Sequence, residues 1–202
     1  MKRIIISEGE NDTIFLKEML SGLSIEEKKI LPFDQLTKNN FKEKKFLQDR
    51  YFEKLETEWM NFDILLKSEG GKPNVVNVTI TKLCYLCNKK YDPILVVDLD
   101  GGVINDFIEK LKVKLYNRFR GYNLTFEEGE LTNCEDAIMC SLKLIKNTKP
   151  MGTIHVVGFN YTMEQATGIK RDFSNNEKIT LSKEYLQNSQ LTEMFKKALQ
   201  IM

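Results

Sequence analysis

Two groups of acidic residues are the side chains in this sequence most able to do chemistry. Each group directly follows a short apolar run that is typical of a buried strand in a parallel sheet. The first group is Glu8, Glu10 and Asp12, and the second is Asp98 and Asp100. Ligands of open α/β sheets bind at the carboxyl ends of the strands, so both groups are placed where a site would form. Asp98 and Asp100 are two residues apart, and an extended backbone would point their carboxylates to the same side.

A cluster of these carboxylates would need a cation. If the two strands are neighbours, they lie about 4.8 Å apart, and Glu8 can approach the aspartate pair. The carboxylates would then repel one another and raise one another's pKa unless a positive charge compensates. Magnesium takes one or two carboxylates, several waters and a substrate phosphate, so it suits such a cluster. The alternative for Asp12 is structural, because acidic residues commonly cap the N-terminus of a helix.

The same residues form two motifs that resemble a known domain. Residues 8–16 contain the pattern Glu-Gly-x-x-Asp-x-x-x-Leu, and residues 94–102 read Ile-Leu-Val-Val-Asp-Leu-Asp-Gly-Gly. They resemble the signature motifs of the Toprim domain. That domain is shared by type IA and type II topoisomerases, bacterial-type primases, overcoming-lysogenization-defect (OLD) nucleases, ribosomal-RNA maturation nucleases and recombination-repair proteins.

The resemblance implies a Toprim-like Rossmannoid sandwich with a defined set of site residues. Glu8 would act as general acid/base or as a metal ligand, Asp98 and Asp100 would bind Mg²⁺ or Mn²⁺, and Asp12 would be a further acidic residue of the site. The reaction would be phosphoryl transfer on DNA or RNA, as in DNA repair or RNA processing. The two motifs lie farther apart than in compact Toprim domains, which fits a helical insertion at 39–60.

Phosphodiester hydrolysis is the simplest reaction for such a site, so we expect an enzyme, a metal-dependent nuclease. A chain of 202 residues leaves no room for the gate and tyrosine-bearing domains of topoisomerases, or for the zinc module and longer core of primases. It also lacks an ATPase region such as accompanies many OLD nucleases. Two alternatives stay open: a primase-like nucleotidyl transferase, and a non-catalytic, metal-dependent module that binds nucleic acid or regulates.

Basic residues near the predicted site are candidates for holding the nucleic acid. Lys72 follows Gly70-Gly71 and could present its ammonium to a phosphate, although an ordinary turn before Pro73 explains it as well. A predicted helix over 104–120 carries further basic residues, with aromatic side chains between them. These basic residues are Lys110, Lys112, Lys114, Arg118 and Arg120, of which the last four are the selected candidates. The mixture suits single-stranded nucleic acid, whereas the alternative is a solvated helix face.

Alternating strands and helices must position these residues. The alternation predicts an α/β sandwich with a mostly parallel central sheet flanked by helices. Strands are expected at 3–7, 29–33, 62–67, 94–98, 122–126 and 153–159, and helices after residue 12, at 75–87, 104–120, 133–145 and 183–200. Residues 39–60 indicate a helical insertion, with a crossover helix equally compatible, and 161–178 a long loop. We expect an α/β domain over 1–160, on which 161–202 pack as a loop and a C-terminal helix.

Composition limits the class of protein. Hydrophobic residues make up 42% and charged residues 29%, and the formal charge is +1. The chain is therefore an ordinary globular one, and any nucleic acid must be held by a local basic patch rather than by bulk charge. The sequence contains no apolar run of membrane-spanning length and no signal-peptide core. We expect a cytoplasmic protein with no membrane partner.

Cysteine and histidine offer fewer functional hypotheses. Cys84-x-x-Cys87 could join Cys134 and Cys140 in a zinc site, but packing in the core is the favoured interpretation of reduced thiols at this spacing. His155 is the single histidine and lies in an apolar run, so sites that need two histidines are excluded. We interpret it as a core residue, which leaves carboxylates to carry any catalysis.

Overall fold

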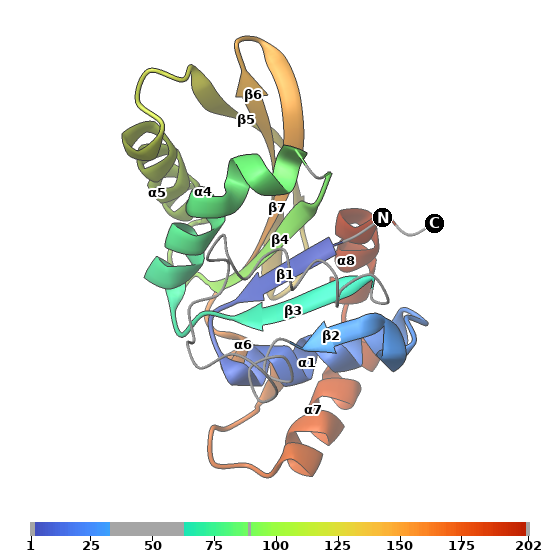
Figure 1. Cartoon of the computed structure of the whole chain (residues 1–202). Helices are drawn as coiled ribbons and strands as arrows, with labels where there is room; N and C mark the ends of the chain where they lie inside the picture. Colours follow the sequence, from blue (N-terminus) through green and yellow to red (C-terminus); the bar gives the residue numbers. More distant parts are fainter. Residues whose placement is uncertain (1–2, 33–62, 89, 201–202) are drawn as a thin grey trace.

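A seven-stranded sheet forms the centre of the part of the chain that the computed structural model describes, residues 3–32, 63–88 and 90–200 (Figure 1). In spatial order the strands are β2 (Ile30–Pro32), β3 (Ile64–Ser68), β1 (Arg3–Ser7), β4 (Asp92–Asp98), β7 (Lys149–Phe159), β6 (Ala137–Lys146) and β5 (Leu124–Asn133). The first five are parallel, and β6 and β5 are added by antiparallel pairing. The fold is therefore an α/β, Rossmann-like fold with a mostly parallel sheet, as the sequence predicts.

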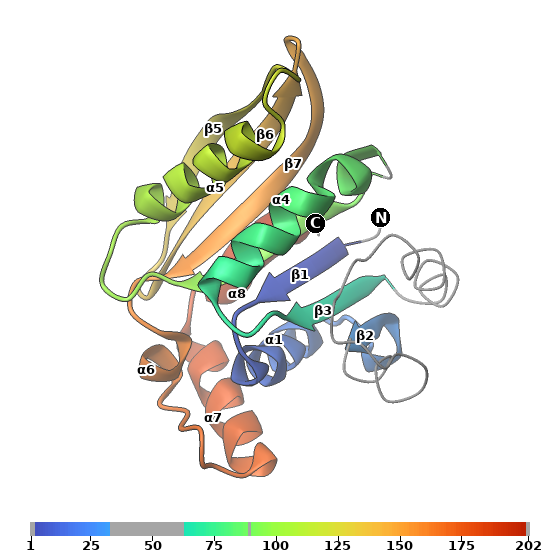
Figure 2. The ribbon, with the colours of Figure 1, turned by 60° about the vertical axis from the view of Figure 1, so that its left-hand side comes forward.

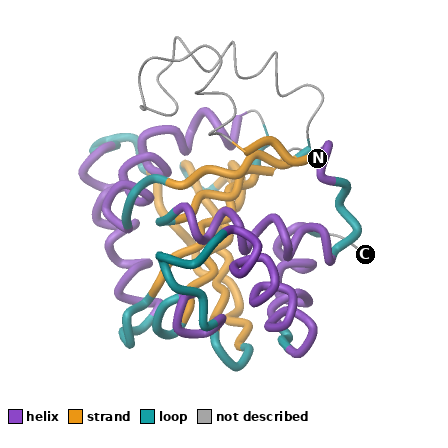
Figure 3. The backbone as a smooth tube through the Cα atoms, turned by 90° about the horizontal axis from the view of Figure 1, so that it is seen from below, coloured by secondary structure: helices purple, strands orange, loops and turns teal. Residues whose placement is uncertain are grey.

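Helices cover both faces of this sheet (Figures 2 and 3). One face packs against α4 (Lys72–Asn88) and α5 (Ile104–Arg118), and the other packs against α1 (Glu10–Gly22), α7 (Asn175–Asn188) and α8 (Leu191–Leu199). The described chain also contains the short helices η1 (Glu27–Lys29) and α6 (Met163–Thr167). Each face of the sheet thus has its own hydrophobic core.

The central strand β1 shows why the apolar runs of the sequence are nearly continuous. Ile4, Ile5 and Ile6 are each 0% exposed. Ile4 and Ile6 belong to the core under α4 and α5, whereas Ile5 belongs to the core under α1 and α8. Because successive side chains of a strand alternate between faces, a strand covered on both sides needs apolar residues at every position.

The predicted helix at 133–145 is wrong. Residues 137–146 form β6, which pairs with β7 in a hairpin whose turn is Asn147-Thr148. Both turn residues have positive φ, 47° and 70°, as two-residue hairpin turns require. Alternate residues Cys140, Leu142 and Leu144 are buried, so the pattern has the period of a strand. β5 is also longer than the predicted 122–126.

The predictions for the C-terminal part need a second correction. Residues 161–178, expected as a loop, contain α6 and the first turn of α7, and the helix expected at 183–200 is two helices, α7 and α8. Ser174 and Glu177 form a capping box at the start of α7, and Thr162 accepts a hydrogen bond from Gln165 N at 3.1 Å at the start of α6. Both Ser-x-x-Glu and Thr-x-x-Gln are sequence signals of a helix start.

The remaining predicted elements are present within the described residues. The strands at 3–7 and 94–98 and the helices at 75–87 and 104–120 are confirmed, with ends that differ by a few residues. The strands predicted at 29–33 and 62–67 are confirmed where they are described, as β2 and β3. The helical insertion predicted at 39–60 lies outside the described residues. None of the described helices is long and apolar enough to cross a membrane.

The first strand and the last helix are joined by a buried arginine. Arg3 Nη1 donates to Asp92 Oδ2 at 3.1 Å, and Arg3 Nη2 donates to Leu199 O at 3.4 Å. Arg3 is 3% exposed, and burial lowers its pKa against the opposing effect of Asp92. The described end of the chain is thereby held against the centre of the sheet.

Candidate functional site

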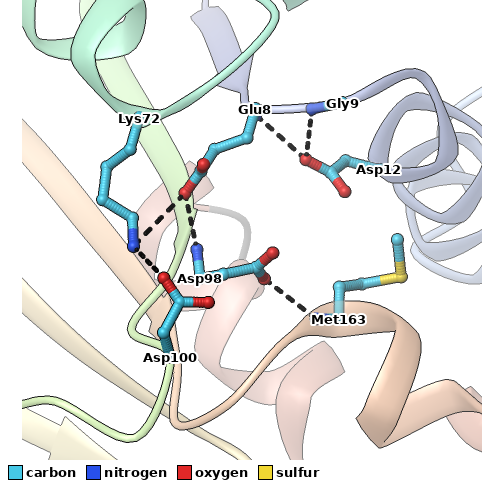
Figure 4. A network of polar contacts seen from close by, with 7 residues as sticks. All are labelled: Glu8, Gly9, Asp12, Lys72, Asp98, Asp100 and Met163. Atoms are coloured by element: carbon cyan, nitrogen blue, oxygen red, sulfur yellow. Dashed lines mark hydrogen bonds and ion pairs between the residues drawn. The ribbon is translucent and has the colours of Figure 1, made fainter.

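The carboxyl ends of β1 and β4 bring the two acidic groups together. These strands are parallel neighbours, so Glu8 after β1 reaches the end of β4. Its Oε1 accepts a hydrogen bond from the backbone N–H of Asp98 at 2.9 Å (Figure 4). The approach of Glu8 to the aspartate pair, which we expected if the two strands were neighbours, is present in the structure.

Asp98 and Asp100 do not project as an extended backbone would place them. β4 ends at Asp98, and Asp100 has a φ of +54°, in the left-handed region. Asp98 Oδ1 accepts from Met163 N at 2.9 Å, whereas Asp100 Oδ2 accepts from Lys72 Nζ at 2.7 Å. The two carboxylates therefore have different partners, and the chain is not extended through Asp100, so the condition under which they would share one side is not met.

Lys72 lies between two of the carboxylates (Figure 4). It is the first residue of α4, and its Nζ is 2.7 Å from Asp100 Oδ2 and 4.0 Å from Glu8 Oε1. The N–H groups of Gly70 and Gly71 donate to Glu8 O at 2.8 and 3.0 Å. These amides fix the loop to β1 instead of facing a phosphate, and the lysine predicted as a phosphate ligand is paired with carboxylates.

Asp12 lies within the first turn of α1, at the third helical position, and its carboxylate caps the backbone of the N-cap residue Gly9. Its Oδ2 accepts hydrogen bonds from Gly9 N at 2.9 Å and Glu8 N at 3.0 Å, and the residue is 5% exposed. Burial, together with the negative charges of Asp98 and Glu164, raises the pKa of Asp12 to about 7. By its contacts, Asp12 orders the loop that carries Glu8.

The cluster holds more negative charge than its surroundings favour. Burial raises the pKa of Glu8, although the Asp98 N–H and the Lys72 ammonium act in the opposite direction. Burial also raises the pKa of Asp98 to about 6, and the charges of Glu8, Glu164 and Asp100 add to the effect. Carboxylates in this condition favour either a proton or an additional cation.

The sequence analysis missed two contributors from α6. Glu164 acts electrostatically on Asp12 and Asp98 and accepts a hydrogen bond from Asn11 Nδ2 at 3.2 Å. Met163 supplies the backbone N–H that holds Asp98. The Thr-x-x-Gln start signal of α6 could have revealed the helix, but no local pattern places it beside β4.

The donor chemistry fits a hard cation bound with few protein ligands. Among residues 3–32, 63–88 and 90–200, no group of three or more His, Cys, Asp and Glu side chains is arranged to hold a metal ion by itself. Mg²⁺, however, usually takes one or two carboxylates and completes its shell with water and phosphate. Glu8, Asp98 and Asp100 offer oxygen ligands of this kind at one sheet edge.

A groove between α4 and α5 begins at the site. Its volume is about 850 Å³, and Lys72 lies at its border with the carboxylates. Apolar side chains Pro73, Val76 and Val113 and the basic side chains Lys110 and Lys114 line it. The carboxylates of Asp106 and Glu109 also line it, so the groove combines apolar side chains with charges of both signs.

The predicted basic residues at 112–120 have different surroundings. Lys114 lines the groove, whereas Lys112 pairs with Glu109 and Glu128. Arg120 lies over the ring of Tyr116, 5.6 Å from its centre, and Arg118 is exposed at the end of the helix. Lys110, which the sequence analysis did not select, is the second lysine of α5 in the groove.

The cysteines and the histidine belong to the cores. All four cysteines are free thiols, and Cys134 and Cys140 lie in the cores on opposite faces of the sheet, so a joint zinc site is excluded. His155 is 7% exposed, and its Nδ1 lies 2.9 Å from Ser141 Oγ. Burial lowers the pKa of His155, as expected for a core histidine.

Comparisons with known proteins add no assignment. No protein-family model and no curated protein matches this sequence. Among solved structures, a similar chain is a de novo designed protein with a P-loop NTPase fold, determined by solution NMR. The two are 13% identical, the similarity covers 100% of this chain and 97% of that chain, and the TM-score is 0.34. A TM-score this low identifies neither a common fold nor a common activity.

Proposed function

We propose that this chain is a Mg²⁺-dependent phosphoryl-transfer enzyme that hydrolyses phosphodiester bonds of nucleic acid, on a Toprim-like domain. The observation that carries the proposal is the contact between the Glu8 carboxylate and the Asp98 N–H. It joins the two acidic groups at adjacent carboxyl ends of parallel strands, where ligands of such sheets bind. Asp100 and the groove between α4 and α5 border the same place.

Each residue would have a definite role in hydrolysis. One or two of the carboxylates of Glu8, Asp98 and Asp100 would hold Mg²⁺, or Mn²⁺ in its place, and water and phosphate would complete its shell. The bound ion would supply charge neutralisation for the attacking and leaving oxygens. Glu8 is fixed at the end of a central strand, and its raised pKa suits it to accept the proton of an attacking water. That water's oxygen bonds to phosphorus as the bond to the leaving oxygen breaks, and the leaving oxygen takes a proton from solvent.

The test compares Glu8→Gln with Glu10→Gln on labelled single-stranded and duplex DNA and RNA. Gln keeps the size of the side chain but removes its charge and basicity, so Glu8→Gln should lower Mg²⁺-dependent cleavage by on the order of 10²-fold or more. Glu10 is exposed two residues further on and serves as the matched control. Full cleavage by Glu8→Gln, or equal losses in both variants, would contradict the assignment of Glu8.

The same assay separates the alternatives. Reactions run with and without nucleoside triphosphates report extension of the labelled strand, which would indicate a primase-like nucleotidyl transferase. Binding that depends on Mg²⁺ without any shortening or extension would indicate a non-catalytic nucleic-acid-binding or regulatory module. Shortening that requires Mg²⁺ and stops with chelator is the result expected here.

A further inference from the structure

We propose that Lys72 is a built-in counterion of the carboxylate cluster, which competes with a divalent cation for Glu8 and Asp100. The inference rests on the proposed metal site and adds a mode of regulation to it. In the cation-free protein, the ammonium neutralises the cluster. Binding of the cation requires that the ammonium leave Asp100, so the affinity of the site is set by an internal competitor.

Lys72 is placed where its ammonium contacts the proposed metal ligands. Its ammonium is 2.7 Å from Asp100 Oδ2 and 4.0 Å from Glu8 Oε1, so it contacts two of the three proposed metal ligands from a third element, α4. The side chains of Lys72 and Glu8 are 21% and 18% exposed. Asp100 is 66% exposed, so solvent screens its ion pair with Lys72 much as it screens a surface pair, whereas the longer contact between Lys72 and Glu8 is screened less.

The carboxylate cluster contains several negative charges, and Lys72 is the positive charge paired with them. Carboxylates from β4, α1, α6 and the loops after β1 and β4 meet here, namely Glu8, Asp12, Asp98, Asp100 and Glu164. Among the described residues, Lys72 is the cation that forms ion pairs with this set. The other contacts of Asp98 and Asp12 are backbone N–H groups, which supply dipoles rather than full charges. Lys72 therefore occupies the electrostatic position that a bound cation would take.

The groove next to Lys72 can receive its ammonium when a cation displaces it from Asp100. Lys72 borders the groove between α4 and α5, which contains the lysines Lys110 and Lys114 and the carboxylates Asp106 and Glu109. Lysine has a flexible four-carbon stem, so a change of rotamer can move the ammonium without moving the helix. A displaced Lys72 would face whatever anion enters this groove.

The experiment measures Mn²⁺ binding by titration in the absence of nucleic acid. Lys72→Met keeps the length of the apolar stem and removes the charge. A unit charge a few ångströms from a divalent ion justifies an expected gain in Mn²⁺ affinity of about tenfold in Lys72→Met. Lys110→Met is the matched control from the same groove and should leave the affinity unchanged.

Thermal unfolding in chelator supplies a second readout. Lys72→Met should have a lower midpoint than wild type, because the carboxylates then repel one another without compensation, and Mn²⁺ should restore it. Equal or weaker Mn²⁺ binding by folded Lys72→Met would overturn the inference, as would an unchanged midpoint in chelator. If wild type and Lys72→Met both fail to bind Mn²⁺ or Mg²⁺, the proposed metal site itself is wrong, a failure distinct from the first two.

Discussion

Gly158 of β7 packs against Leu99, the residue between Asp98 and Asp100. A Cβ added at Gly158 would lie 2.9 Å from each of Cγ, Cδ1 and Cδ2 of Leu99. Leu99 is 9% exposed, and its N–H donates to Phe159 O at 2.7 Å. The Leu99 side chain therefore lies directly across the backbone of Gly158. We expect Gly158→Ala to displace Leu99, and with it Asp98 and Asp100 on either side.

The size of the effect follows from these contacts. Three atoms of one side chain would be too close to the new methyl group, so rotation about a single bond does not relieve them all. Overpacking of this kind costs about 1–3 kcal/mol of unfolding free energy. Leu99→Ala alone should cost about 2–3 kcal/mol, because it removes a nearly buried side chain. In the double variant the two changes compensate, so the summed loss should shrink by about 1–2 kcal/mol.

Urea unfolding of the single and double variants measures this coupling, with m-values used to check that unfolding stays two-state. Gly22→Ala is the matched control, because Gly22 ends α1 with no atom within 4 Å of an added Cβ. It should gain about 0.5–1 kcal/mol from helix propensity. Additive losses in the Gly158→Ala/Leu99→Ala double variant, or a Gly158→Ala protein as stable as wild type, would refute the reasoning.

Three further predictions concern the site and the core. Asp100→Asn should weaken Mg²⁺ binding in calorimetric titration. The thermal unfolding midpoint in chelator should stay level or rise, because one repelling carboxylate is removed. A large drop in that midpoint would show that Asp100 is structural. Lys114→Met should weaken binding of a single-stranded oligonucleotide and reduce the slope of log affinity against log salt by about 0.7. Lys112→Met is the control and should change neither the affinity nor the slope. Equal effects of the two variants would contradict the assignment of Lys114 to the groove. Burial lowers the pKa of His155, so the folded state binds a proton at this imidazole less well than the unfolded state does. The contribution of neutral His155 to the free energy of unfolding is therefore fully present above about pH 6.5 and is lost as the pH falls below that value. Urea midpoints at about pH 7.5 and about pH 5.5 should fall more for wild type than for His155→Gln, and an equal fall would exclude this contribution.

The general location of the site could be predicted because it depends on local signals. An apolar run followed by acidic residues marks the carboxyl end of a buried strand, and Glu8 and Asp98 both have this context. The orientation of Asp100 could not be predicted in the same way. It depends on a left-handed turn and on a lysine from another helix, and neither is encoded in the Asp-Leu-Asp pattern.

The errors have two causes, because local signals were missed at 137–146 and at the starts of α6 and α7, whereas the place of Glu164 was decided by tertiary packing. Residues 137–146 combine apolar and polar side chains in a way that suits a helix at first sight, but β7 offers them an antiparallel partner. Glu164 reaches the cluster because α6 packs beside β4, so its role depends on a contact between distant parts of the chain. Capping signals predict where α6 begins but not which strand it meets.

The central place of β1 has consequences for folding. This strand is synthesised before its register partners Ile64 and Asp92, so until they are available it is an apolar segment with both hydrogen-bonding edges open. The hairpin of β6 and β7 closes locally through a two-residue turn and can form in microseconds. Pairing of β1 instead requires long loops to close, which is slow and exposes the chain to aggregation. We therefore expect Glu8 to reach Asp98 among the late steps of folding, so that partly folded chains would lack the cation affinity that we propose for the native protein.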